Sequence, residues 1–61
     1  MKREISIEIE GKVYVADYEL ISKVLTVNSS LGSKSTQLGG MAPESLARIL
    51  LRELVQEKTR R

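Results

Sequence analysis

The stretch at residues 43–58, PESLARILLRELVQEK, is the one long helical pattern in this chain of 61 residues. Successive residues of an α-helix are rotated by about 100°, which places most of the aliphatic residues on one continuous stripe. The stripe consists of Leu46, Ala47, Leu50, Leu51, Leu54 and Val55. Ile49 widens the apolar arc to about 240°, whereas a surface helix needs little more than about 100°. One small sheet is not expected to cover this arc, so we predict that the helix faces both its own sheet and a second copy of the chain.

The size of the chain also favours a dimer. A core built from so few residues barely outweighs the conformational entropy of the chain, and small domains rely on disulfides, metals or oligomerisation. The sequence has no Cys and no His, so a disulfide and a structural zinc site are excluded and oligomerisation remains. The predicted dimer interface is Leu46, Ile49, Leu50, Leu54 and Val55. Ile49 and Val55, at the flanks of the arc, are its first candidates.

The residues before the helix show the alternation of strands. In residues 3–10, REISIEIE, apolar and polar residues alternate strictly, which is typical of a half-buried strand, and Gly11 suits the turn that follows. Residues 13–20, VYVADYEL, predict a second strand whose two faces are less cleanly divided. Residues 24–29, VLTVNS, predict a third strand. The turn signal of residues 21–23 is weak, because none of these residues favours a positive φ.

A polar segment leads from these strands to the helix. Residues 33–38, SKSTQL, predict a short fourth strand at the sheet edge, where hydroxyls and charge discourage aggregation. Pro43 suits the first helical position, because its missing N–H is not needed there. The order predicts an α+β fold: an antiparallel β-meander of three to four strands in residues 1–38, followed by one C-terminal helix at 43–58. Residues 1–61 are expected to form a single domain.

Residues 31–40, LGSKSTQLGG, concentrate glycine and hydroxyl residues without forming a phosphate-binding motif. A Walker loop requires G-x-x-x-x-G-K-[ST] leading directly into a helix. Here Ser33 precedes Lys34, and the helix begins only at Pro43. An edge strand and a turn are therefore favoured. The alternative is that backbone amides around Gly39, Gly40 and the helix start hold an anion.

Residues capable of catalysis do not form a recognisable arrangement. The carboxylates of Glu4, Glu8, Glu10, Asp17 and Glu19 alternate along the first two strands. Acid–base catalysis or a metal site would require some of them to converge in a pocket, whereas alternation predicts the wet face of a sheet. Tyr14 and Tyr18 share one strand face and could stack on bases, but core packing is favoured. No catalytic residue, metal or cofactor is predicted, and the protein is not expected to be an enzyme.

Basic residues offer a second function class. Net charge is +2, a modest excess compared with most nucleic-acid-binding domains. Arg48 and Arg52 share the polar side of the helix, and together with Lys34 and the C-terminal residues Lys58, Arg60 and Arg61 they are candidates for polyanion binding. A solvated face with pairs such as Glu44–Arg48 is favoured over this alternative.

GSKSTQLGG at residues 32–40, followed by PESLARILLRELV at 43–55, resembles a group of short uncharacterised bacterial proteins of similar length. The similarity begins at the second strand and includes Tyr14, Ala16 and Tyr18. The resemblance implies a small homodimeric α+β protein and brings no functional residue with it. No apolar run approaches the roughly 18 residues of a membrane helix, and the N-terminus lacks a signal peptide's apolar segment, so a cytoplasmic location is expected.

The sequence therefore predicts a small non-enzymatic homodimer that acts as an interaction or accessory protein. Its partners would be a second copy and an unknown protein, with no membrane and no nucleic acid. The alternative is a weak nucleic-acid or polyanion-binding module that uses Lys34, Arg48 and Arg52.

Overall fold

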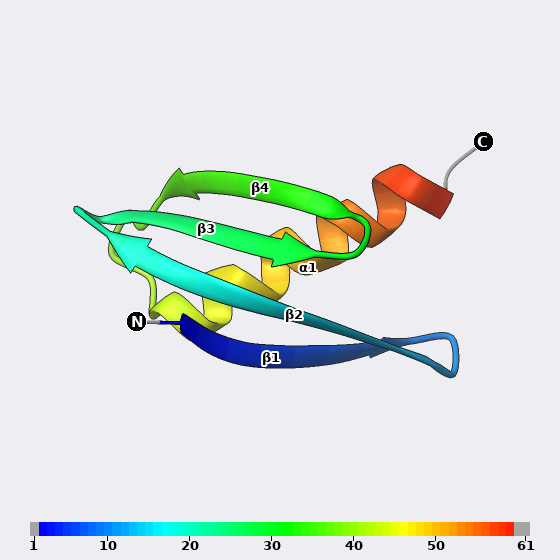
Figure 1. The fold of residues 1–61 in the computed structure, drawn as a ribbon. Helices are drawn as coiled ribbons and strands as arrows, with labels where there is room; N and C mark the ends of the chain where they lie inside the picture. The colour runs from blue at the N-terminus through cyan, green and yellow to red at the C-terminus, as the bar shows by residue number, and fades with distance from the viewer. Residues whose placement is uncertain (1, 60–61) are drawn as a thin grey trace.

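The computed structural model describes residues 2–59 and contains four strands and one helix. These are β1 (Lys2–Ile9), β2 (Lys12–Ile21), β3 (Val24–Ser29), β4 (Gly32–Gln37) and α1 (Pro43–Thr59). The strands form one antiparallel sheet in the order β1-β2-β3-β4, and α1 lies diagonally across one side of it (Figure 1). The predicted antiparallel meander with a polar fourth strand at its edge and one C-terminal helix is confirmed. Arg60 and Arg61, expected to add basic charge, lie outside the described residues.

The pairing register assigns every strand residue to one of two faces, because directly opposite residues of antiparallel strands point to the same side. The helix face, which packs on α1, supplies Ile5, Ile7, Ala16, Tyr18, Leu25 and Val27 to the core. The other side, here called the open face, is not covered by any element among residues 2–59. Its side chains are Glu4, Ser6, Glu8, Val13, Val15, Asp17, Glu19, Ile21, Val24, Thr26, Asn28, Ser33, Ser35 and Gln37.

The helix begins at the proline that the sequence indicated. The carbonyl of Ala42 accepts a hydrogen bond from the amide of Leu46 at 3.1 Å, and Pro43 occupies the first turn, where its missing N–H costs nothing. All six stripe residues are buried, namely Leu46, Ala47, Leu50, Leu51, Leu54 and Val55. They pack against the helix face in one cluster with the strand residues.

The sheet covers more of the apolar arc than expected and leaves the Ile49 flank exposed. Because the helix contacts all four strands, the sheet is wide enough to bury both the middle of the arc and the Val55 flank. Of the five residues predicted to form a dimer interface, Leu46, Leu50, Leu54 and Val55 are buried within the single chain. Only Ile49 offers substantial surface, with 43% of it exposed. These five residues therefore do not form an exposed surface, and homodimerisation itself stays a prediction.

Two of the three hairpins use two-residue turns with positive φ at both positions. Glu10 and Gly11 have φ of 52° and 81°, and Ser22 and Lys23 have φ of 52° and 64°. Two-residue hairpins favour this type I′ geometry because its twist matches that of the strands. Lacking glycine, the Ser22-Lys23 turn adopts left-handed backbone at a cost of about 1 kcal/mol per residue. The weak turn signal therefore marks a strained turn.

Candidate functional site

The open face exposes four branched aliphatic side chains. The exposed fractions are 65% for Val13, 53% for Val15, 61% for Ile21 and 38% for Val24. Val13 and Val15 alternate along β2, and Ile21 lies opposite Val24 where β2 and β3 meet their turn. The two pairs therefore form separate aliphatic areas on the same face. Paired exposed apolar side chains mark interaction sites more often than single ones do.

Acidic residues surround the aliphatic area on the β1–β2 half. Glu4 lies opposite Asp17 and Glu8 lies opposite Val13, all on the open face. A shallow hollow of about 380 Å³ adjoins Glu4 and Asp17, with Asn28 and Ser29 also in its wall. The carboxylates thus line a solvated surface, as the alternation predicted, while Glu10 lies in the β1–β2 turn. Among residues 2–59 no group of three or more His, Cys, Asp or Glu side chains is placed to hold a metal ion.

Apart from Val24 at its end, the β3–β4 half of the open face is polar and uncharged. It presents Thr26, Asn28, Ser33, Ser35 and Gln37. The hydroxyls of Thr26 and Ser35 lie 3.0 Å apart across the two strands and form a hydrogen bond. The open face is therefore divided into an acidic and aliphatic half and a hydroxyl-rich half that ends at β4.

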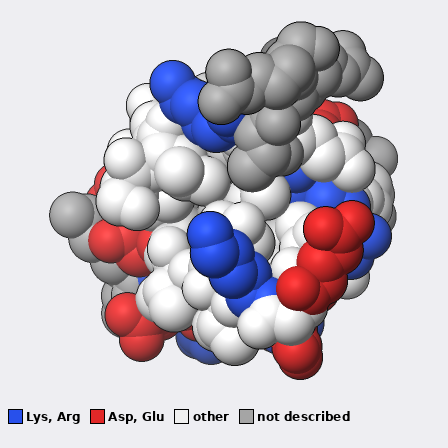
Figure 2. Space-filling view, turned by 90° about the vertical axis from the view of Figure 1, so that its right-hand side faces the viewer, with Lys and Arg blue, Asp and Glu red and all other residues white. Residues whose placement is uncertain are grey.

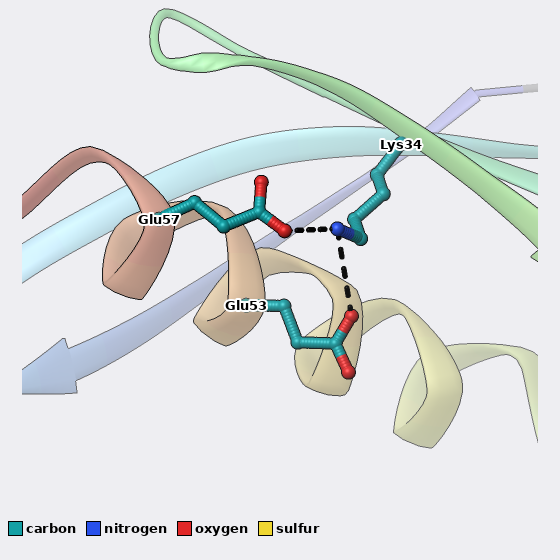
Figure 3. A network of polar contacts seen from close by, with 3 residues as sticks. All are labelled: Lys34, Glu53 and Glu57. Atoms are coloured by element: carbon teal, nitrogen blue, oxygen red, sulfur yellow. Dashed lines mark hydrogen bonds and ion pairs between the residues drawn. The ribbon is translucent and has the colours of Figure 1, made fainter. Parts of the chain in front are cut away.

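Lys34 lies between Ser33 and Ser35 of the open face, but its own side chain points to the helix face. Its Nζ donates a hydrogen bond to Glu57 Oε2 and lies 3.8 Å from Glu53 Oε1, so it joins β4 to α1 (Figure 3). The hydrogen bond to Glu57 raises the pKa of Lys34 above its usual 10.5; loss of hydration opposes this rise, and the charges of Glu57 and Glu53 add to it. Lys34 is thereby neutralised by two carboxylates of the same chain.

The structure does not bring the three polyanion candidates together. Arg48 Nη2 lies 2.5 Å from Glu44 Oε2, which confirms the expected pair one helical turn apart. On the helix, Arg48 and the two Glu partners of Lys34 are separated by about 140–180° of rotation, so Arg48 and Lys34 lie on opposite flanks. Arg52 is exposed on the outer side. Figure 2 shows a face on which blue and red side chains are interspersed with neutral ones, which does not suit a phosphate backbone.

Tyr14 and Tyr18 belong to the helix face and not to the open face. Tyr18 is buried, and the half-buried Tyr14 packs against the same core. Their rings are therefore used in packing, and they do not form a platform on which bases could stack.

The helix start adjoins a second, more apolar hollow. It measures about 460 Å³ and is lined by Arg3, Tyr18, Leu20, Ala42, Pro43 and Glu44. Gly39 and Gly40, both with positive φ, form the preceding turn, in which the amide of Met41 donates to the carbonyl of Leu38 at 3.3 Å. One of the amides near the suggested anion cradle is thus already hydrogen-bonded.

Comparisons with known protein families, with curated proteins and with solved structures found no match. Within the described part of the chain, no helix combines the length and apolar character needed to cross a bilayer.

Sequence reasoning did not identify the open face as a site, although a signal was present. Residues 13–20 carry apolar side chains on both faces of the strand, which a strand with one wet face does not need. This pattern could have identified Val13 and Val15 as apolar residues on the open face. The pairing of Ile21 with Val24 depends on the turn register and could not be read from periodicity.

Proposed function

We propose that this protein is a small non-enzymatic interaction module that acts as a homodimer in the cytoplasm and binds a partner protein on its open face. The single observation that carries the proposal is the uncovered sheet face, where Val13 and Val15 lie exposed beside Glu4, Glu8 and Asp17. Burying such aliphatic side chains is favourable by about 25 cal/mol per Å². A second protein is the simplest source of that burial.

The charge of the open face indicates what kind of partner fits. Glu4 and Asp17 face each other across β1 and β2, and Glu8 follows on the same side. Packing two open faces together would bring these carboxylates against their own copies, which costs binding free energy. A partner surface that combines aliphatic side chains with Lys or Arg would instead satisfy both parts of the face.

The nucleic-acid alternative has less support, because it lacks a shared basic surface. Lys34 is paired with Glu53 and Glu57, and Arg48 is paired with Glu44. Phosphate contacts would have to compete with these intramolecular pairs.

The proposal is tested with a variant that changes the open face and leaves the strand intact. Val13→Thr with Val15→Thr keeps both side chains β-branched, so β2 is expected to fold, while the apolar surface is lost. Affinity capture from the source cells should retain a protein on the parent chain and lose it on this double variant. Ile49→Thr, a similar change at an exposed residue on the helix, should retain it. Equal capture by the parent and the double variant would contradict the proposal.

A further inference from the structure

The outer edge of β4 is prepared for pairing with another strand. The amide of Leu38 donates to the carbonyl of Lys23 at 2.9 Å, which makes the adjacent pair Val24–Gln37 a non-hydrogen-bonded pair of the ladder. Because hydrogen-bonded and non-hydrogen-bonded pairs alternate, Lys34 and Thr36 direct their main-chain groups toward β3. Ser33, Ser35 and Gln37 therefore direct their N–H and C=O groups outward, and none of these groups is hydrogen-bonded to another described residue.

The β4 edge carries a single charge, and that charge is already paired within the chain. Edge strands are kept from pairing by charged side chains, especially Lys, by inward-pointing charges, by Pro or by a bulge. The one charged residue of β4 is Lys34, and its ammonium group is held under the sheet by Glu53 and Glu57 (Figure 3). The residues at the outward positions, Ser33, Ser35 and Gln37, are all uncharged.

The opposite edge of the sheet provides the contrast. In β1 the residues that point to the open face are Glu4, Ser6 and Glu8, and by the same alternation they also direct their main-chain groups outward. Pairing two β1 strands about Ser6 would place Glu4 of each copy directly opposite Glu8 of the other. Like charges in that position are destabilising. The two edges therefore differ in their capacity for self-association.

We infer that two copies of this chain associate through their β4 strands, antiparallel and related by a two-fold axis at Ser35, to form one continuous eight-stranded sheet. This contact would be the interface of the homodimer, and it therefore rests on the homodimer of the proposed function. In this register Ser35 lies opposite the partner's Ser35, and Ser33 lies opposite the partner's Gln37. Each outward N–H and C=O group of β4 then lies opposite a matching group of the partner's β4, which gives about six main-chain hydrogen bonds.

The β4 edge is complementary to itself, and for this reason we assign the pairing strand to a second copy of the chain. Residues that face each other must share a face, so the two-fold axis has to pass through a residue and not between residues. An axis at Lys34 would bring two ammonium groups together and leave Gln37 without a partner in the strand. An axis at Ser35 opposes hydroxyl to hydroxyl on the open face and Lys34 to the partner's Thr36 on the helix face. Both open faces then lie on the same side of the extended sheet.

Two matched proline variants test which edge is used. Ser35→Pro removes an outward N–H and places a ring in the path of the partner strand, while the β3–β4 ladder does not need that N–H. Ser6→Pro makes the same change at the β1 edge. Sedimentation of the parent should show a dimer, and Ser35→Pro should raise its dissociation constant about tenfold or more, since two hydrogen bonds across the axis are lost. Ser6→Pro should leave the dimer unchanged.

The register is tested by single cysteines, because the chain has none of its own. Ser35→Cys should form an intermolecular disulfide under mild oxidation, since the Cα atoms of a hydrogen-bonded antiparallel pair are about 5.5 Å apart. Ser33→Cys should not, because the two introduced thiols would be about 13 Å apart along the strands. Cross-linking of the Ser33→Cys variant and not of the Ser35→Cys variant would overturn the proposed register.

The outcomes separate the inference from the proposed function. An unchanged dissociation constant in Ser35→Pro, or loss of the dimer in Ser6→Pro, would overturn the β4 contact and leave a homodimeric module standing. A monomeric parent at high micromolar concentration would overturn the homodimer and the β4 contact together. Binding of a partner to the open face is decided separately by the Val13 and Val15 variants.

Discussion

Replacing Leu51 by Ala should remove a large share of the stability of this protein. Leu51 has no exposed surface and belongs to the stripe that α1 buries against the sheet. A buried Leu→Ala substitution costs about 2–5 kcal/mol, because the transfer free energy is lost and a cavity remains. A domain of this length has a free energy of unfolding of about 3–9 kcal/mol, at about 0.05–0.15 kcal/mol per residue. We expect a loss of about 3 kcal/mol, within the range for such substitutions.

Urea denaturation followed by far-UV circular dichroism measures this loss. With a slope of about 1 kcal/mol per molar urea for a small domain, the midpoint should fall by about 3 M, or the variant should already be partly unfolded in buffer. The control is Ile49→Ala on the same helix, where 43% exposure predicts a loss below about 1 kcal/mol. Equal losses for the two variants would refute the reasoning, because Ile49 would then be buried in an interface.

Three further predictions follow from the turns and charges. Ser22→Asn with Lys23→Gly supplies the residues that a type I′ turn prefers, and scanning calorimetry should show a gain of about 1 kcal/mol, or about 4–8 °C in Tm; an unchanged Tm would mean that the turn is not strained. Because the pKa of Lys34 is raised in the folded state, its ion pairs stabilise the protein fully below pH 10.5 and cease to do so as pH rises through the folded-state pKa. The difference in stability between the parent and Lys34→Gln should therefore shrink as pH rises from about 9 to about 12 at low salt. A constant difference would contradict the pairing. Fluorescence anisotropy with a DNA duplex at about 150 mM salt should show no binding tighter than about 1 μM, and a lower Kd would revive the polyanion alternative.

Local sequence patterns were sufficient to predict the elements of this fold. The strict alternation of residues 3–10 and the helical stripe of residues 43–58 each specify both the element and the face it buries. The polar segment at residues 33–38 was recognised as an edge strand because it has too little apolar surface for a central one. Its polarity also anticipated where the free main-chain groups would lie.

The width of the surface that covers the helix could not be read from periodicity. Ile49 and Val55 occupy the two flanks of the same apolar arc and carry equivalent sequence signals. Val55 is buried and borders the same hollow as Ile9 and Tyr14, where the β1–β2 hairpin extends beside the helix. Ile49 lies on the other flank and stays exposed. Which flank is covered depends on the twist of the sheet and the crossing direction of the helix, both of which are tertiary properties.

The contacts of Lys34 could not be predicted from the sequence, for a related reason. Its partners Glu53 and Glu57 lie far along the chain on another element, so no local spacing connects them. From the sequence, Lys34 looked like a free cation beside hydroxyl residues. The register of β4 places it on the helix face, where Glu53 and Glu57 pair with it, so it is not a free cation for a polyanion.

Amide hydrogen exchange at two protein concentrations tests the β4 dimer most directly. The N–H groups of Ser33, Ser35 and Gln37 should exchange slowly at about 1 mM, where the dimer forms, and become at least about tenfold faster on dilution to a concentration at which it dissociates. The outward N–H groups of Glu4, Ser6 and Glu8 should exchange fast at both concentrations. Fast exchange of the three β4 amides throughout, or concentration-dependent protection of the β1 amides in their place, would contradict the β4 contact.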